Sequence, residues 1–164
     1  MDWAFWFYWI MATTLGWVFG DLFFGGIPVI ISGAFIAALQ WAVLYKRIQK
    51  AWRWALVSSA AWIIGFILLT ILFPGSFELF AGLILGGVVG IAQWFILRNE
   101  VDWSGWWIVI SIMAWITGLN LMPGLLTSGA LPGALTGLTL MILFRFSSRN
   151  EQNVKGEKYR RHHG

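Results

Sequence analysis

The residues that could carry acid–base or metal chemistry lie outside the apolar stretches of the chain. Asp21 and Glu78 stand at the ends of such stretches, and His162 and His163 belong to the C-terminal tail. If the apolar stretches cross a membrane, an ionisable residue in the middle of one of them would signal a functional site, and the sequence has none there. The chain also has no Cys, so it lacks the usual ligands for haem, iron–sulfur clusters or zinc. We therefore predict no catalytic residue, metal or cofactor, and no nucleic-acid partner.

Two glutamines within the apolar stretches are the clearest candidates for specific polar contacts. Gln40 and Gln93 occupy equivalent places, each followed by a tryptophan. A buried amide needs a hydrogen-bond partner. A neighbouring helix could supply that partner, and so could a lipid headgroup, a quinone or a pigment carbonyl.

The 13 tryptophans divide into two groups. Trp17, Trp62 and Trp115 share one position in a repeated motif and form either a packed core or an aromatic pocket for an elongated apolar ligand. With Gln40 and Gln93 they make up the candidate ligand-binding set. The other group is expected at the cytoplasmic interface, where indoles anchor membrane helices: Trp3, Trp6, Trp41, Trp52, Trp54, Trp94, Trp103, Trp106 and Trp107.

The composition predicts the elements that position these residues. The 164 residues are 59% apolar and 11% charged, against about 45–50% and about 25% in soluble domains. A membrane span needs about 20 mainly apolar residues, and six stretches qualify. These stretches are apolar on all sides, which favours helices over the alternating strands of a barrel. We predict an all-α integral membrane protein with helices at 3–20, 28–45, 54–73, 77–97, 106–122 and 126–144.

The distribution of basic residues predicts the orientation. All 11 Lys and Arg residues fall in the second and fourth loops or at the C-terminal end. Basic residues near span ends stay cytoplasmic, so we expect both termini in the cytoplasm and the spans in a plasma membrane. Residues 1–146 form the predicted membrane domain, and residues 147–164 a basic, disordered cytoplasmic tail.

The odd stretches repeat the motif W-x3-[ST]-x3-W-x2-G. At about 100° per residue its four positions fall on one helix face. Because each repeat holds two spans, all three enter the membrane in the same direction, which permits a pseudo-threefold bundle. The repeats cover about 1–49, 50–102 and 103–146. The motif residues are Trp9, Thr13, Trp17 and Gly20; Trp54, Ser58, Trp62 and Gly65; and Trp107, Ser111, Trp115 and Gly118.

The even stretches carry the pattern G-x3-[AG]-x2-Q-W-x2-L at 33–44 and 86–97. Small residues four apart let helices approach closely in lipid, although these positions could also line a central cavity. In the last stretch we place the pattern on Gly133, Gly137, Leu140, Met141 and Phe144, where Gln-Trp becomes Leu-Met. The expected helix-packing residues are Gly33, Ala37, Gly86, Gly90, Gly133, Gly137, Thr13, Ser58 and Ser111.

With these repeats, W-x7-W-x2-G followed by G-x3-G-x2-Q-W-x2-L-R, the chain resembles a set of bacterial multipass membrane proteins of unknown function. The resemblance covers nearly the whole chain outside the tail and implies architecture without an activity. We expect a structural or accessory component of the bacterial inner (plasma) membrane, in contact with the lipid bilayer and other membrane proteins. The alternative is a binder or carrier of a neutral apolar molecule such as a lipid, quinone or carotenoid.

Overall fold

The computed structural model describes residues 2–23 and 28–163, and all regular secondary structure in these residues is helical. Prolines and glycines between the apolar stretches end one helix and start the next, as at the turn 74–76. The elements are α1 (Trp3–Phe23), α2 (Pro28–Leu44), α3 (Trp52–Leu72), α4 (Phe77–Leu97), α5 (Trp106–Ile116), the π-helical segment η1 (Thr117–Leu121) and α6 (Thr127–His163).

The six predicted stretches are confirmed as helices, with ends that differ by a few residues except at the C-terminal end of α6. Three helices are long and apolar enough to cross a membrane, at Trp52–Leu72, Leu79–Leu97 and Thr127–Ser147. Two shorter apolar helices, Val29–Leu44 and Trp106–Leu121, lie beside them. The described part of the chain is therefore a helical protein with at least part of its length suited to a bilayer.

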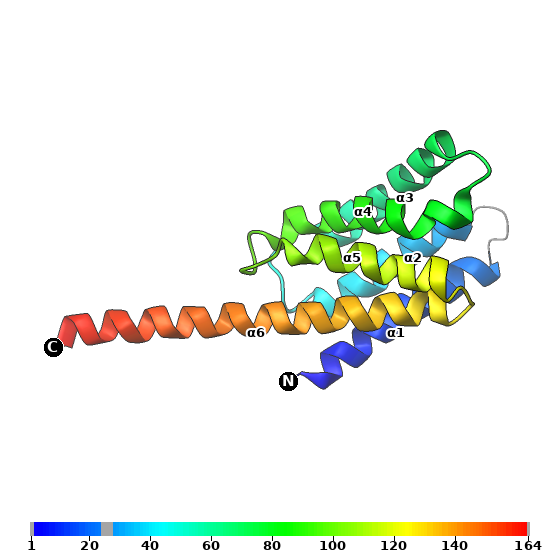
Figure 1. Cartoon of the computed structure of the whole chain (residues 1–164). Coiled ribbons are helices and arrows are strands. Elements are labelled where there is room, and N and C mark those ends of the chain that lie inside the picture. The colour runs from blue at the N-terminus through cyan, green and yellow to red at the C-terminus, as the bar shows by residue number, and fades with distance from the viewer. Residues whose placement is uncertain (1, 24–27, 164) are drawn as a thin grey trace.

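The helices form a closed ring in chain order, and Figure 1 shows this bundle from the side. Each helix packs against its neighbours in sequence, and α6 packs against α1 to close the ring. The N-terminus and the free end of α6 lie at the same end of the bundle as the α2–α3 and α4–α5 loops. A ring of three consecutive hairpins is the arrangement that a pseudo-threefold repeat permits.

Two apolar clusters fill the interior of this ring. One surrounds Trp9, Trp54 and Trp107 near the α2–α3 and α4–α5 loops. The other surrounds Trp62 and Trp115 toward the opposite end. Large apolar side chains also cover much of the outside of the bundle, with Ile71, Leu79 and Leu121 among the most exposed. An outer surface of this kind is suited to lipid or to another apolar protein surface.

Helix α6 continues well past the other helices (Figure 1) and ends at His163. The sequence predicts no regular structure from residue 147 onward, so this extension differs from the expectation. Glu, Gln, Lys and Arg are good helix formers, and the segment holds no proline to stop the helix. Its single glycine, Gly156, costs only about 1 kcal/mol in a helix.

Candidate functional site

Three tryptophans from the odd helices meet at the centre of the ring. The ring centroids of Trp9 and Trp54 are 5.7 Å apart, those of Trp54 and Trp107 5.8 Å, and those of Trp9 and Trp107 6.5 Å. All three pairs are edge-to-face, a favoured arrangement for aromatic rings. Each indole is at most 1% exposed. The prediction that Trp54 and Trp107 anchor their helices at the membrane interface is therefore wrong. Each of these side chains points to the centre of the bundle.

Gln40 and Gln93 lie beside this tryptophan triangle, and each of them hydrogen-bonds to two neighbouring helices. Gln40 of α2 donates from Nε2 to the Thr13 hydroxyl of α1 over 3.0 Å. Its Oε1 accepts from the Trp54 indole of α3 over 3.1 Å. Gln40 thus joins the first repeat to the second. Of the partners that the sequence left open for this amide, a neighbouring helix is the one that the structure supplies.

Gln93 repeats this arrangement one hairpin later. Its Nε2 donates to the Ser58 hydroxyl over 2.9 Å, and its Oε1 accepts from the Trp107 indole over 3.1 Å. Ser58 lies on α3 and Trp107 on α5, so the geometry at the second repeat boundary matches that at the first. All of these side chains are buried, where an amide–indole bond is shielded from water.

The third boundary, between α6 and α1, uses a threonine. The Trp9 indole donates to the Thr136 hydroxyl over 2.9 Å, and that hydroxyl donates to the Pro132 carbonyl over 2.5 Å. Thr136 therefore takes the place of Gln40 and Gln93 as the acceptor of the next repeat's indole. The ring of indole bonds closes through a shorter side chain.

This bond and the glycine contacts correct the register of the third repeat. An added Cβ on Gly86 would meet Ile112, Ser111 and Trp115, and one on Gly129 would meet the corresponding atoms of Thr14, Thr13 and Trp17. Gly129 thus corresponds to Gly86, and the equivalent set is Gly129, Gly133, Thr136, Gly137 and Leu140. The predicted register is wrong by four residues, because Gly129, Gly133 and Gly137 fit the small-residue pattern in two registers one turn apart.

Ser111 shows the consequence of the shorter side chain. The equivalent residues of the first and second repeats, Thr13 and Ser58, each accept a hydrogen bond from a glutamine. The Ser111 hydroxyl is buried and has no hydrogen-bond partner in the described part of the chain. Thr136 is too short to donate across to it, since its hydroxyl bonds within α6.

A second tryptophan layer lies about 12 Å along the axis, two turns from the first. The Trp62 and Trp115 centroids are 4.8 Å apart, and those of Trp17 and Trp115 are 6.3 Å apart. The structure thus brings the candidate ligand-binding residues together around the axis, with Trp17 at the side of the layer. Trp62, Trp115, Gln40 and Gln93 border a shared cavity of about 10 Å³. That volume is far below that of a lipid, quinone or carotenoid.

The predicted helix-packing glycines lie where neighbouring helices approach closely. A Cβ on Gly33 would lie 2.1 Å from Trp62 Cγ, and one on Gly90 would lie 2.8 Å from Ser111 Cβ. Gly133 faces Ile10 and Thr13, at 3.0 and 3.1 Å. The remaining positions are equally enclosed: Ala37 is fully buried, Gly86 lies against Ile112, and Gly137 lies against Trp9.

Replacing Gln93 by leucine tests the amide bonds with little change in side-chain size. The Trp107 N–H and the Ser58 hydroxyl would each lose their amide partner in a buried layer. An unsatisfied buried donor costs about 1–3 kcal/mol, and we expect Gln93→Leu to lower the free energy of unfolding in mixed micelles by about that amount. Gln49→Leu, in the exposed α2–α3 loop, serves as the matched control. Equal stability of the two variants would contradict the role given to the amide.

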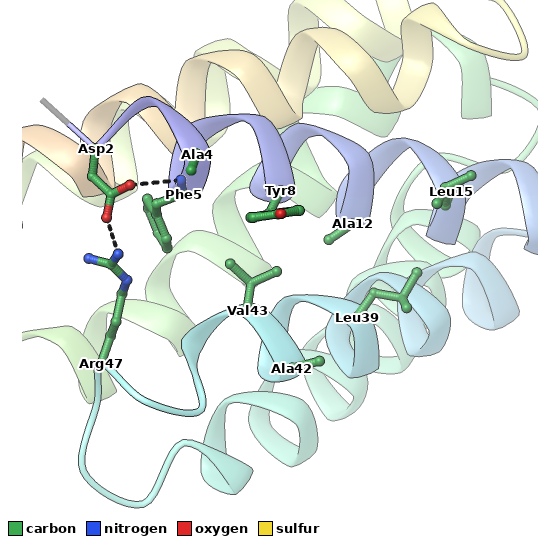
Figure 2. Close-up of a pocket in the computed structure, with 10 residues that line it drawn as sticks. All are labelled: Asp2, Ala4, Phe5, Tyr8, Ala12, Leu15, Leu39, Ala42, Val43 and Arg47. Atoms are coloured by element: carbon green, nitrogen blue, oxygen red, sulfur yellow. Dashed lines mark hydrogen bonds and ion pairs between the residues drawn. The ribbon is translucent and has the colours of Figure 1, made fainter.

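Asp2 and Arg47 form an exposed ion pair beside a pocket between α1 and α2 (Figure 2). The Asp2 carboxylate also accepts from the Phe5 backbone N–H over 3.0 Å, which caps the start of α1. The pocket measures about 480 Å³, with Tyr8 and Val43 on its walls. Sequence reasoning missed this pair because its members are 45 residues apart.

The Phe5 N–H and the Arg47 guanidinium hold the pKa of Asp2 below its ordinary value. A carboxyl with a lowered folded-state pKa stabilises the fold above its unfolded pKa of about 3.9. That contribution is lost as the pH falls through the folded-state pKa. We expect Arg47→Gln to raise the Asp2 pKa part of the way back, because the Phe5 bond remains. A carboxyl carbon NMR titration measures this, and an unchanged pKa in the variant would show that the ion pair does not form.

A second groove lies between α5 and α6 at the same end of the bundle. It measures about 490 Å³ and is walled by apolar residues that include Trp103, Trp106 and Phe146. Tyr8 and Trp106 occupy equivalent positions in the first and third repeats, so the two grooves are related by the repeat. Their walls supply contact area for an apolar chain and hold no acid–base pair other than Asp2 and Arg47.

Metal chemistry finds no support among the described side chains, which contain no group of three His, Asp or Glu residues able to hold an ion. The side chains of Glu78, His162 and His163 lie outside those that the structure describes. Comparison of the chain with protein-family models, curated proteins and solved structures found no match. The function is therefore inferred from the geometry of the bundle.

Proposed function

We propose that this chain is a structural or accessory component of the bacterial inner membrane and performs no catalysis. The observation that carries the proposal is the filled centre of the ring, where two tryptophan layers and an amide layer leave about 10 Å³. A carrier that moves a molecule along the axis needs a lined passage. With the axis closed, the apolar outer surface is the part of the molecule available for contacts, with the lipid bilayer and with other membrane proteins.

The proposed topology has six spans with both termini in the cytoplasm. Its support is the segregation of charge: Arg47 and Arg98 lie in loops at the end of the bundle that also holds both termini (Figure 1). Basic loops are retained on the cytoplasmic side. Val29–Leu44 and Trp106–Leu121 are the shortest proposed spans, and they cross as part of a ring whose longer members set the bilayer thickness.

Purification from the native bacterium in a mild detergent, followed by native mass spectrometry, tests the accessory role. We expect the 18.5 kDa chain within a larger species that contains at least one other membrane protein. Replacement of an exposed outer residue such as Leu79 or Ile71 by alanine identifies the contacting face by loss of that species. A solitary, partner-free chain under these conditions would contradict the proposal.

A second candidate function is binding of a neutral apolar molecule, and the groove between α5 and α6 favours it. Its volume of about 490 Å³ and its walls from Trp103 and Trp106 suit an acyl or isoprenoid chain. In this proposal the ligand lies on the outside of the bundle, away from Trp17, Trp62 and Trp115. Organic extraction of the purified protein, with Ile142→Trp to fill the groove, tests it. Equal lipid, quinone and pigment content in both proteins would remove this candidate.

A further inference from the structure

The centre of the bundle holds a small polar cavity between the two tryptophan layers. Its volume is about 10 Å³. Four polar residues border it, one from α1, one from α2, one from α4 and one from α6: Thr13, Gln40, Gln93 and Thr136. Each of these residues is at most 5% exposed, so the cavity lies in the interior of the bundle.

The polar atoms around the cavity have hydrogen-bonding capacity that the protein–protein bonds do not use. A hydroxyl has one donor and two acceptor sites, and an amide nitrogen has two donors. The Thr13 hydroxyl donates to the Trp9 carbonyl and accepts from Gln40, which leaves one acceptor site. The Thr136 hydroxyl donates to the Pro132 carbonyl and accepts from Trp9, which also leaves one.

The two glutamine amides have the complementary capacity. Gln40 Nε2 gives one hydrogen to Thr13, and Gln93 Nε2 gives one to Ser58. Each nitrogen keeps a second hydrogen. Two donors and two acceptors therefore border one cavity, and this set complements a single molecule that accepts twice and donates twice.

We propose that the cavity is the binding site of one structural water molecule. The water accepts from Gln40 and Gln93 and donates to the hydroxyls of Thr13 and Thr136. A buried water needs about 10–15 Å³ of accessible volume and two to four polar partners, and this site meets both conditions. Trp107 of one tryptophan layer and Trp62 and Trp115 of the other also border the cavity.

The third repeat explains why the space exists. Gln40 and Gln93 fill their positions with a carboxamide, whereas Thr136 at the equivalent position has a shorter side chain. The shorter side chain leaves a space between Thr136 and the two glutamines, and the water lies in that space. In this way the water connects α6 to the glutamines of α2 and α4, a contact that Thr136 cannot make directly.

The site is tested by a crystal structure at a resolution that shows ordered water, and by water-to-amide cross-relaxation in solution. Protein labelled with 15N at glutamine and carrying Gln49→Leu and Gln152→Leu retains the side-chain amides of Gln40 and Gln93 alone. We expect oxygen density within hydrogen-bond distance of the four residues. We also expect rotating-frame cross-peaks from water to both amides, opposite in sign to the diagonal. An empty cavity without such cross-peaks would overturn the proposal.

Variants at position 136 distinguish a water bound at this site from water elsewhere in the interior of the bundle. Thr136→Gln supplies the missing carboxamide, so the density and both cross-peaks should be lost. Thr139→Gln, three residues away and bordering the groove between α5 and α6, should keep them. Thr136→Ser retains the hydroxyl and the space, and it should also keep them if the larger substitution does not fold. Persistence of the cross-peaks in Thr136→Gln would contradict the assigned position.

Discussion

Replacing Gly33 by alanine is expected to cause one of the two largest losses of stability in this protein. The new Cβ would lie 2.1 Å from Cγ and 2.6 Å from Cβ of Trp62. The Trp62 side chain is 1% exposed and packs edge-to-face on Trp115, so displacing it would disturb the core. Overpacking a core costs about 1–3 kcal/mol, and we expect the upper end of that range. The measurement is the free energy of unfolding in mixed micelles, followed by circular dichroism.

Gly87→Ala is the matched control for this substitution. A Cβ on Gly87 would approach only the end of the Ile112 side chain, at 3.9 Å, and alanine is the better helix former. We therefore expect no loss of stability for Gly87→Ala. Comparable losses in both variants would mean that α2 and α3 do not approach as closely as the structure places them.

Replacing Trp107 by alanine is expected to have an effect of similar or greater size. The substitution removes two edges of the central tryptophan triangle and leaves Gln93 Oε1 without its indole donor. Trp-to-Ala changes in cores cost about 3–5 kcal/mol. Because one indole touches helices from all three repeats, we also expect a less cooperative unfolding transition.

The adjacent residue provides the control for this prediction. Trp106 is 59% exposed, whereas Trp107 is 1% exposed, so Trp106→Ala changes an outward-facing indole of the same helix turn. Substitutions on such surfaces usually alter stability by about 0.5 kcal/mol or less. If Trp106→Ala were the more damaging change, the centre of the bundle would have been assigned to the wrong helix face.

The positions of the helices could be predicted because the signals for them are local. Runs of apolar residues set the lengths of the helices, and Pro74 and Pro123 with their neighbouring glycines mark two of the turns. The threefold repeat was likewise readable from the spacing of Trp, Ser or Thr, and Gly. The close approach at Gly33 and Gly86 follows from the same spacing.

The centre could not be predicted in the same way. A motif on one helix face shows that Trp54, Ser58 and Trp62 share that face, but it does not say whether the face meets lipid, an interface or the axis. Three glycines four residues apart in α6 left two registers open, and long-range contacts with α1 decide between them: the bond from Trp9 to Thr136 and the close approach at Gly129. Closure of the ring between α6 and α1 is a tertiary property with no local signal.

The central claim is that three two-helix repeats cross the membrane in the same direction around a filled axis. Because the chain has no cysteine, single-cysteine variants need no altered background. A membrane-impermeant maleimide applied to intact bacteria should label Ser76→Cys and Leu125→Cys, in the α3–α4 and α5–α6 turns. It should label Gln49→Cys and Asn99→Cys only after the membrane is opened. Labelling of Ser76→Cys and Gln49→Cys from the same side would contradict the claim.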